Sequence, residues 1–144
     1  MPPQRDSNER YIGIDYGTKR IGIAVSDPLE MFATPIATIE NNQNFWKRFK
    51  EILAPYKIRA FVLGYPLKED GSESVLSSEI RKFADAVKKK FNKEVILIDE
   101  RYSSSIAERQ IIETVKSKKK RQDKSLVDKK AAAVILQSFL DEKT

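Results

Sequence analysis

Apolar and polar residues follow a pattern over the first part of the chain that predicts three strands. Apolar residues dominate 11–14 and 21–25, and a short turn joins these two segments. We expect Gly17 to permit a positive φ angle in this hairpin turn. The next β-branched segment, Met31–Ile39, contains Pro35, which cannot donate a hydrogen bond to a sheet ladder. The pattern therefore predicts three antiparallel strands, with the third at the sheet edge and interrupted at the proline.

The rest of the chain alternates helical and strand patterns. Apolar residues at helical spacing predict helices over 44–54 and 76–91, and apolar runs predict strands over 60–63 and 95–98. The run over 95–98 has no polar residue, which is typical of a strand covered on both faces. Renewed helical spacing predicts a last helix over 126–140.

These elements together predict the fold class and the domain organisation. Ser105 and Glu108 have the spacing of a capping box and predict one more helix, through about Val115. Because the later strands are separated by crossovers long enough to be parallel, we expect an α/β fold on a mixed five-stranded sheet. Residues 1–10 are polar and are expected to form a flexible tail, so that 11–144 forms a single domain.

Composition limits the chemistry that this domain can perform. The chain has no Cys and no His, which excludes disulfides, thiolate zinc sites and the commonest general base, so that a metal must be held by oxygen ligands. A net charge of +6 favours a polyanionic partner such as nucleic acid. We expect a cytoplasmic protein without a membrane association, because the chain shows neither a signal-peptide pattern nor an apolar run that would span a bilayer.

Three acidic residues stand at the ends of apolar segments. Asp15 follows the first predicted strand, and Glu100 follows the strand predicted over 95–98. Asp128 shares one helical face with later apolar residues of the last helix, which turns this face toward the sheet. Burial of a carboxylate is costly unless it is paired or binds a metal, so these three positions require an explanation.

Each carboxylate alone also has a purely structural explanation. Asp15 can initiate the hairpin turn by accepting backbone hydrogen bonds. Glu100 can pair with Arg101 or another base. Asp128 can be a favourable charge at a helix N-terminus or part of a cap with Ser125. Together, however, the three supply the hard oxygen ligands that Mg²⁺ or Mn²⁺ prefers, and two such ions can activate a water and stabilise the leaving oxygen of a phosphodiester.

Four blocks of sequence follow one another in order and span nearly the whole chain after the first ten residues. They are GIDYGTKRIGIAVSDP (Gly13–Pro28), LGYPLKEDGSES (Leu63–Ser74), DERYSSSIAER (Asp99–Arg109) and VDKKAAAVILQSFLD (Val127–Asp141). This set resembles the YqgF family of RNase H-like proteins, whose members are known as Holliday junction resolvases and pre-16S rRNA nucleases. Four blocks in order are far more specific than any one of them.

The resemblance implies an RNase H-like fold and a metal-dependent nuclease that matures the 5′ end of pre-16S rRNA in ribosome biogenesis, on the RNA itself or in a pre-ribosomal particle. It places the acidic site positions at Asp15, Glu100 and Asp128, the same three residues. In the wider RNase H clan, the strand after the first helix often ends in an acidic residue, whereas here it ends in Gly64-Tyr65-Pro66. We therefore expect the second carboxylate from the later strand, with Asp99 as the alternative to Glu100, because only one of two adjacent side chains faces the site.

Several basic residues flank these acids. Lys19 and Arg20 lie near the hairpin tip beside Asp15, and Arg101 follows Glu100. We expect the three bases to contact the nucleic acid by steadying a scissile phosphate, or else to balance the carboxylates.

A basic segment, KSKKKRQDKS (Lys116–Ser125), has six basic residues in ten positions and is expected to contact the phosphate backbone; the alternative is a solvated loop. Its central bases are Lys118, Lys119, Lys120 and Arg121. Gly13, Gly17 and Gly22, which surround Asp15 in the sequence, are expected to let a phosphate backbone approach closely. Because the aromatic residues mostly fall at core spacing in the predicted helices, we expect no stacking surface for single strands.

Other functions remain open at this stage. The GIDYGT block also resembles the phosphate loop of actin-like ATPases and sugar kinases, but those proteins bind nucleotide between two such domains, and this chain supplies one. A resolvase that acts on branched DNA and a non-catalytic RNA-binding assembly factor are the main alternatives. Retention of all three carboxylates favours a nuclease. The sequence leaves open endonuclease or exonuclease action and a monomeric or homodimeric state.

Overall fold

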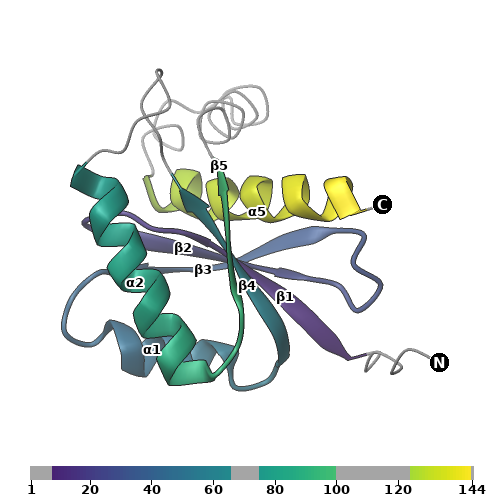
Figure 1. Ribbon diagram of the computed structural model, residues 1–144, viewed down its shortest axis with the longest axis horizontal. Coiled ribbons are helices and arrows are strands. Elements are labelled where there is room, and N and C mark those ends of the chain that lie inside the picture. The colour runs from purple at the N-terminus through teal and green to yellow at the C-terminus, as the bar shows by residue number, and fades with distance from the viewer. Residues whose placement is uncertain (1–7, 66–74, 100–123, 144) are drawn as a thin grey trace.

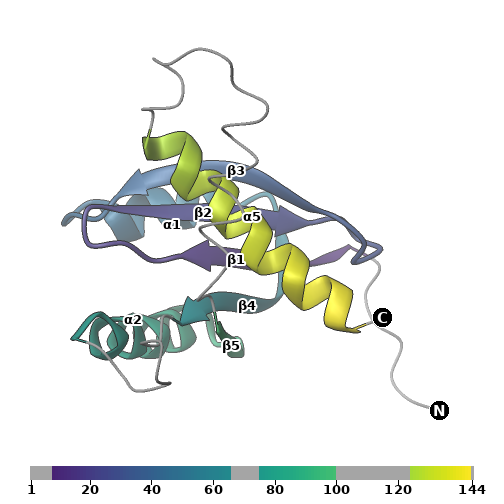
Figure 2. The ribbon, with the colours of Figure 1, turned by 90° about the horizontal axis from the view of Figure 1, so that it is seen from above.

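Five strands form one mixed sheet with helices on both of its faces (Figures 1 and 2). The structure is a computed structural model, and it describes residues 8–65, 75–99 and 124–143, with the backbone alone for 124–129. The strands are β1 (Glu9–Asp15), β2 (Arg20–Ser26), β3 (Ala33–Glu40), β4 (Lys57–Tyr65) and β5 (Val95–Asp99), and the helices are α1 (Phe45–Leu53), α2 (Val75–Phe91) and α5 (Lys124–Lys143).

The sheet has the topology that the sequence predicts. The strand order is β3-β2-β1-β4-β5. β1 pairs antiparallel with β2, and β2 pairs antiparallel with β3, whereas β4 runs parallel to β1 and β5 runs parallel to β4. The carboxyl ends of β1, β4 and β5 therefore meet at one edge of the sheet, where Ile14 pairs with Leu63 and Leu63 pairs with Leu97.

The proline in β3 is accommodated at the sheet edge. β3 is an edge strand, as predicted, but it continues through Pro35 instead of stopping there. The register with β2 shifts at this point, because Ala24 pairs with Pro35 and Ile23 with Ala37, so that one residue of β3 is left over. Such a bulge absorbs the missing donor of the proline without ending the strand.

Two details of the β1–β2 hairpin differ from the prediction. β1 begins at Glu9, so the strand includes the last two residues of the predicted tail. Gly17 has no positive φ; instead, a Cβ at this position would lie 2.5 Å from the carbonyl oxygen of Arg20. Glycine is therefore needed in this turn because the chain crosses itself closely, and not for its backbone angle.

The two faces of the sheet carry different side chains. On one face, called here the α5 face, α5 crosses β1, β2 and β3 above small strand residues (Figure 2). On the other, called the aromatic face, α1 and α2 pack against the sheet through a cluster of rings. The small residues of the α5 face include Gly13, Ala24, Ala60 and Ala132, and the rings of the aromatic face include Phe45, Phe49, Phe61 and Phe83.

Gly13 has a different role from the one expected. A Cβ at this position would lie 2.6 Å from the Leu136 Cβ and 2.9 Å from the Ala132 carbonyl oxygen. The side of the strand that was expected to admit a phosphate backbone is thus occupied by α5. Glycine allows this helix to approach β1 more closely than any other residue would.

The prediction that residues 95–98 form a strand covered on both faces is wrong. β5 is an edge strand of the described sheet, and Leu97 is 41% exposed. The strand packs through Ile96 and Ile98 toward the α5 face and through Val95 toward the aromatic face. A continuous apolar run therefore occurs in β5 without full burial of the strand.

The helix predicted from Ser105 lies outside the described residues. Among the helices that are described, none is long and apolar enough to cross a membrane.

Candidate active site

Asp15 ends β1 at the sheet edge where the parallel strands also end. Side chains alternate along a strand. The Tyr11 side chain packs in the cluster of the α5 face, and the backbone at Gly13 lies against α5. Asp15 therefore belongs to the α5 face, and it is partly exposed. Its neighbour Tyr16 packs on the opposite face against Phe83, with 5.0 Å between ring centroids. The chain thus presents consecutive residues to the two faces at this edge.

The register between β1 and α5 leads from Asp15 toward Asp128. Tyr11 meets the end of the helix, where its ring lies 4.9 Å from the ring of Phe139, and Gly13 meets the middle, between Ala132 and Leu136. Two strand residues advance about 6.6 Å, which corresponds to about four residues of helix. The direction of this register, from Tyr11 to Gly13 and on toward Asp15, leads to the first turns of α5, where Asp128 lies.

The position of Asp99 bears on the choice between Asp99 and Glu100. Ile96 and Ile98 pack toward the α5 face, and Val95 packs toward the aromatic face. Alternation therefore puts Asp99, which is exposed, on the aromatic face, opposite to Asp15. Glu100 lies outside the described residues. Because Asp99 and Asp15 lie on opposite faces of the sheet, the alternation argues against Asp99 as a second ligand of a metal held by Asp15.

The donor chemistry at this edge fits a hard divalent cation. The one predicted ligand whose side chain is described, Asp15, offers carboxylate oxygens at a partly exposed strand end. Because the whole chain lacks His and Cys, oxygen atoms are the donors available, and these are the ligands that Mg²⁺ and Mn²⁺ prefer. No group of three or more acidic residues is brought together within the described part of the chain, which leaves out Glu100 and the side chain of Asp128.

Two of the predicted basic residues lie beside Asp15. Lys19 is exposed in the β1–β2 turn, and Arg20 begins β2. Asn41 anchors this turn: its backbone N–H donates to the Lys19 carbonyl at 2.9 Å, and its Nδ2 donates to the Gly17 carbonyl at 2.9 Å. The turn is therefore held in place next to Asp15. The remaining predicted bases, Arg101, Lys118, Lys119, Lys120 and Arg121, lie outside the described residues.

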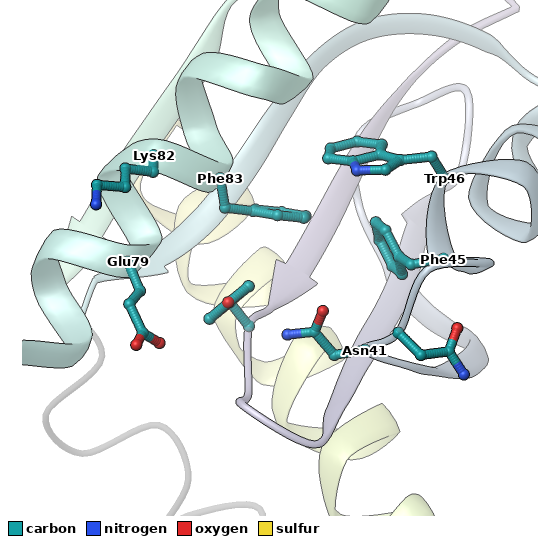
Figure 3. Close-up of a pocket in the computed structure, with 8 residues that line it drawn as sticks. Asn41, Phe45, Trp46, Glu79, Lys82 and Phe83 are labelled. Carbon is teal, nitrogen blue, oxygen red and sulfur yellow. The ribbon is translucent and has the colours of Figure 1, made fainter.

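The structure also contains a pocket that the sequence did not predict (Figure 3). It has a volume of about 290 Å³ and opens between the β1–β2 turn, the start of α1 and the first half of α2. Its lining residues are Tyr16, Asn41, Asn42, Phe45, Trp46, Glu79, Lys82 and Phe83. Four of these eight are aromatic, so part of the ring cluster of the aromatic face can be reached from this pocket. The pairing of Tyr16 with a ring of α2 is a long-range contact that periodicity does not reveal.

Comparison with known proteins identifies the family. Residues 9–142 match the family described as "RuvX: Holliday junction resolvase". The chain belongs to this family. The match covers every described strand and nearly all of α5, so the RuvX family shares the whole domain and not one motif.

Relatives of known name cover the RuvX domain at similar length. A protein of Geobacillus sp. (strain WCH70) is 41% identical over 138 residues, 93% of this chain and 99% of that protein. A protein of Sulfurihydrogenibium sp. (strain YO3AOP1) is 37% identical over 134 residues, 92% of this chain and 90% of that protein. Both carry the name "Putative pre-16S rRNA nuclease".

A solved structure shares the fold. The fowlpox virus resolvase, in a complex with its substrate Holliday junction DNA, matches 93% of this chain and 98% of its own with a TM-score of 0.55 and 16% identity. This likeness confirms the predicted RNase H-like architecture: a mixed five-stranded sheet between helices.

Proposed function

We propose that this RuvX-family protein is a nuclease that hydrolyses phosphodiester bonds in pre-16S rRNA during maturation of its 5′ end. The observation that carries the proposal is the end of β1, where a partly exposed carboxylate, Asp15, lies on the face covered by α5, at the side of the sheet where β4 and β5 also end. The names of the relatives supply the substrate class. A ribosomal RNA precursor would be met in the cytoplasm, free or in a pre-ribosomal particle.

The proposed ligand set is Asp15, Glu100 and Asp128. The set is supported by two observations. The carboxyl ends of the parallel strands β1 and β5 lie at the same side of the sheet, and Asp99 is assigned to the other face. Their carboxylates would hold Mg²⁺ or Mn²⁺, and two ions are expected. Bound divalent cations lower the pKa of a coordinated water and neutralise charge on the leaving oxygen.

The bases around this edge would orient the substrate. Lys19 and Arg20 stand on the anchored β1–β2 turn, where each can contribute a charge-assisted hydrogen bond to a phosphate next to the scissile one. Arg101 and the bases at 118–121 are proposed to contact the backbone farther away, with the salt dependence that counterion release imposes.

The direct test compares wild type with Asp15→Asn on precursor ribosomal RNA, with Mg²⁺, with Mn²⁺ and with EDTA. We expect metal-dependent cleavage by wild type and a loss of at least about a hundredfold in the variant, because residues that merely support a metal ligand already contribute about ten- to a hundredfold. Asp99→Asn is the matched control and is expected to cleave like wild type. Equal rates for wild type and Asp15→Asn would refute the assignment.

A second candidate function, resolution of four-way DNA junctions, is favoured by the description of the family. The same variants tested on a four-way junction separate the two proposals. Cleavage of the junction, with the RNA precursor left intact, would replace RNA with branched DNA as the substrate. Binding of RNA without cleavage under any metal condition would favour a non-catalytic assembly factor.

A further inference from the structure

The aromatic pocket lies at the same sheet edge as Asp15 but on the opposite face. Tyr16, which lines the pocket, follows Asp15 directly, so their Cα atoms are about 3.8 Å apart. Asn41, also in the lining, bonds to the turn that follows. A molecule in the pocket and a group held at Asp15 would therefore lie at the same end of β1, on opposite faces of the sheet.

Rings from three separate elements form the interior of the pocket. Figure 3 shows Phe83 of α2 directed toward Phe45 and Trp46 of α1. Phe45 and Phe83 are almost fully buried and form the floor, whereas Tyr16 and Trp46 are partly exposed. The Trp46 ring stacks on Phe83 with 5.4 Å between centroids and an interplanar angle of 21°. The interior is thus lined by rings that also pack in the core cluster of the aromatic face.

The rim of the pocket is polar. Asn41 and Asn42 border it beside the turn, and Glu79 and Lys82 border it on α2. Because Asn41 uses its Nδ2 on the Gly17 carbonyl, its Oδ1 is oriented and can accept a hydrogen bond. Amide and carboxylate groups around an aromatic floor match a planar heterocycle with donors and acceptors at its edge.

The helices on both sides of the pocket are strongly basic. α1 and α2 together carry eight basic residues and three acidic ones. The basic residues are Lys47, Arg48, Lys50, Arg81, Lys82, Lys88, Lys89 and Lys90, and all are exposed. A positive surface with an aromatic-lined pocket is the combination that proteins use for single-stranded nucleic acid, in which the backbone follows the charge and the bases contact the rings.

We propose that this pocket binds one unpaired nucleobase of the RNA, at the end of β1 that also carries Asp15. The inference rests on the proposed function and adds a substrate requirement: the RNA must carry an unpaired base near the segment that is cleaved. A base in a continuous duplex cannot enter the pocket, because its faces are stacked and its edge is paired.

The test measures binding in EDTA, so that it does not depend on cleavage. Trp46 is the single tryptophan of the chain, and its emission reports on the pocket. The probes are a short single-stranded oligoribonucleotide, the same strand without its bases, and the duplex of the same sequence. We expect the first to change the emission of Trp46 saturably and to bind about tenfold more tightly than the strand without bases.

Two variants locate the effect. Tyr16→Leu keeps an apolar contact with Phe83 but removes the ring, and it should reduce the difference in affinity between the two single strands toward none. Lys89→Ala, on α2 but outside the pocket lining, removes one positive charge. It should weaken the binding of both single strands and leave the ratio of their affinities unchanged. The wild-type comparison decides the question even if Tyr16→Leu does not fold.

The outcomes separate this inference from the proposed nuclease activity. Equal affinity for strands with and without bases, or the same emission change with the duplex, would overturn the base pocket even if wild type cleaves RNA. A base-dependent emission change would support the pocket even if no metal condition gave cleavage, and in that case the nuclease assignment would fail alone.

Discussion

The two faces of the sheet use opposite kinds of side chain to hold their helices. On the α5 face, glycine and alanine let one helix lie directly against the strands. On the aromatic face, rings fill the wider space beneath two helices. Close backbone packing fixes the position of a helix, which suits a face on which Asp15 and Asp128 are proposed to form one site. Ring packing leaves a pocket at its margin, which suits the binding of a flat ligand.

The largest expected effect is on the aromatic face. Phe49 is fully buried and its ring contacts those of Phe45, Phe61 and Phe91, at centroid distances of 5.1, 6.1 and 5.4 Å. Phe49→Ala should lower the free energy of unfolding by about 3–5 kcal/mol, since it removes a ring from a close-packed cluster. Urea unfolding measures this loss. The matched control is Phe32→Ala, at a 64% exposed ring, which should change stability by less than about 0.5 kcal/mol.

The next effect concerns the α5 face. Gly13→Ala puts a Cβ where Leu136 and the Ala132 carbonyl already lie, so α5 must move away from β1. We expect a loss of about 1–3 kcal/mol in the free energy of unfolding, together with weaker Mn²⁺ binding in a calorimetric titration. Wild-type stability and wild-type metal binding in this variant would show that the close approach is not what aligns the site.

The independence of the two faces can be measured by combining Gly13→Ala with Phe49→Leu, a milder change than Phe49→Ala. Gly13→Ala and Phe49→Leu lie on opposite sides of the sheet and share no partner among the contacts described above. Their effects on the free energy of unfolding should therefore add within about 0.5 kcal/mol. A larger deviation would mean that the sheet transmits displacement from one face to the other.

The smallest effect lies in the β2–β3 loop, away from both faces. Asp27 Oδ1 accepts hydrogen bonds from the backbone N–H groups of Met31 at 2.7 Å and Phe32 at 2.9 Å. Burial raises the pKa of Asp27, but the backbone hydrogen bonds together outweigh it, and the pKa is lowered. A lowered folded pKa means that the carboxylate stabilises the fold above its unfolded pKa and loses this contribution as the pH falls through the folded value.

Asp27→Asn should therefore cost about 0.5 kcal/mol near neutral pH, a small figure because the group is partly exposed, and nothing in acid below both pKa values. Urea unfolding of wild type and variant at neutral and acid pH gives the comparison. A cost that grew toward acid pH would reverse the sign assigned to this carboxylate.

Periodic spacing and apolar runs were sufficient to predict the strands and helices that are described, because α1 and α2 bury one apolar face and β2 and β4 are buried on both faces. They were also sufficient to place Asp15 at a strand end. They could not reveal that Gly13 lies beneath Leu136, since residues far apart in sequence meet only through the crossing of α5 over β1. The pocket was missed for the same reason, because Tyr16 and Phe83 meet only in the folded chain.

The apolar run of β5 shows the converse limit of sequence patterns. Leu97 has the same character as its neighbours Ile96 and Ile98, yet it is 41% exposed because β5 ends the described sheet. Strand order decides this burial, and no local pattern encodes strand order. By contrast, the alternation of side chains along β5 assigns Asp99 to the aromatic face once the faces of Ile96 and Ile98 are known. It therefore places Asp99 on the face opposite to Asp15.

Asp15 of β1 and Asp128 of α5 are proposed to serve one metal site from two elements. The decisive measurement is the rate of precursor rRNA cleavage in Mg²⁺ by Asp15→Asn, Asp128→Asn and the double variant. Residues that act as a unit are not additive, so the double variant should be no slower than the slower single variant, within about threefold. Losses that multiply in the double variant, or an Asp128→Asn variant that cleaves at the wild-type rate, would contradict a shared site.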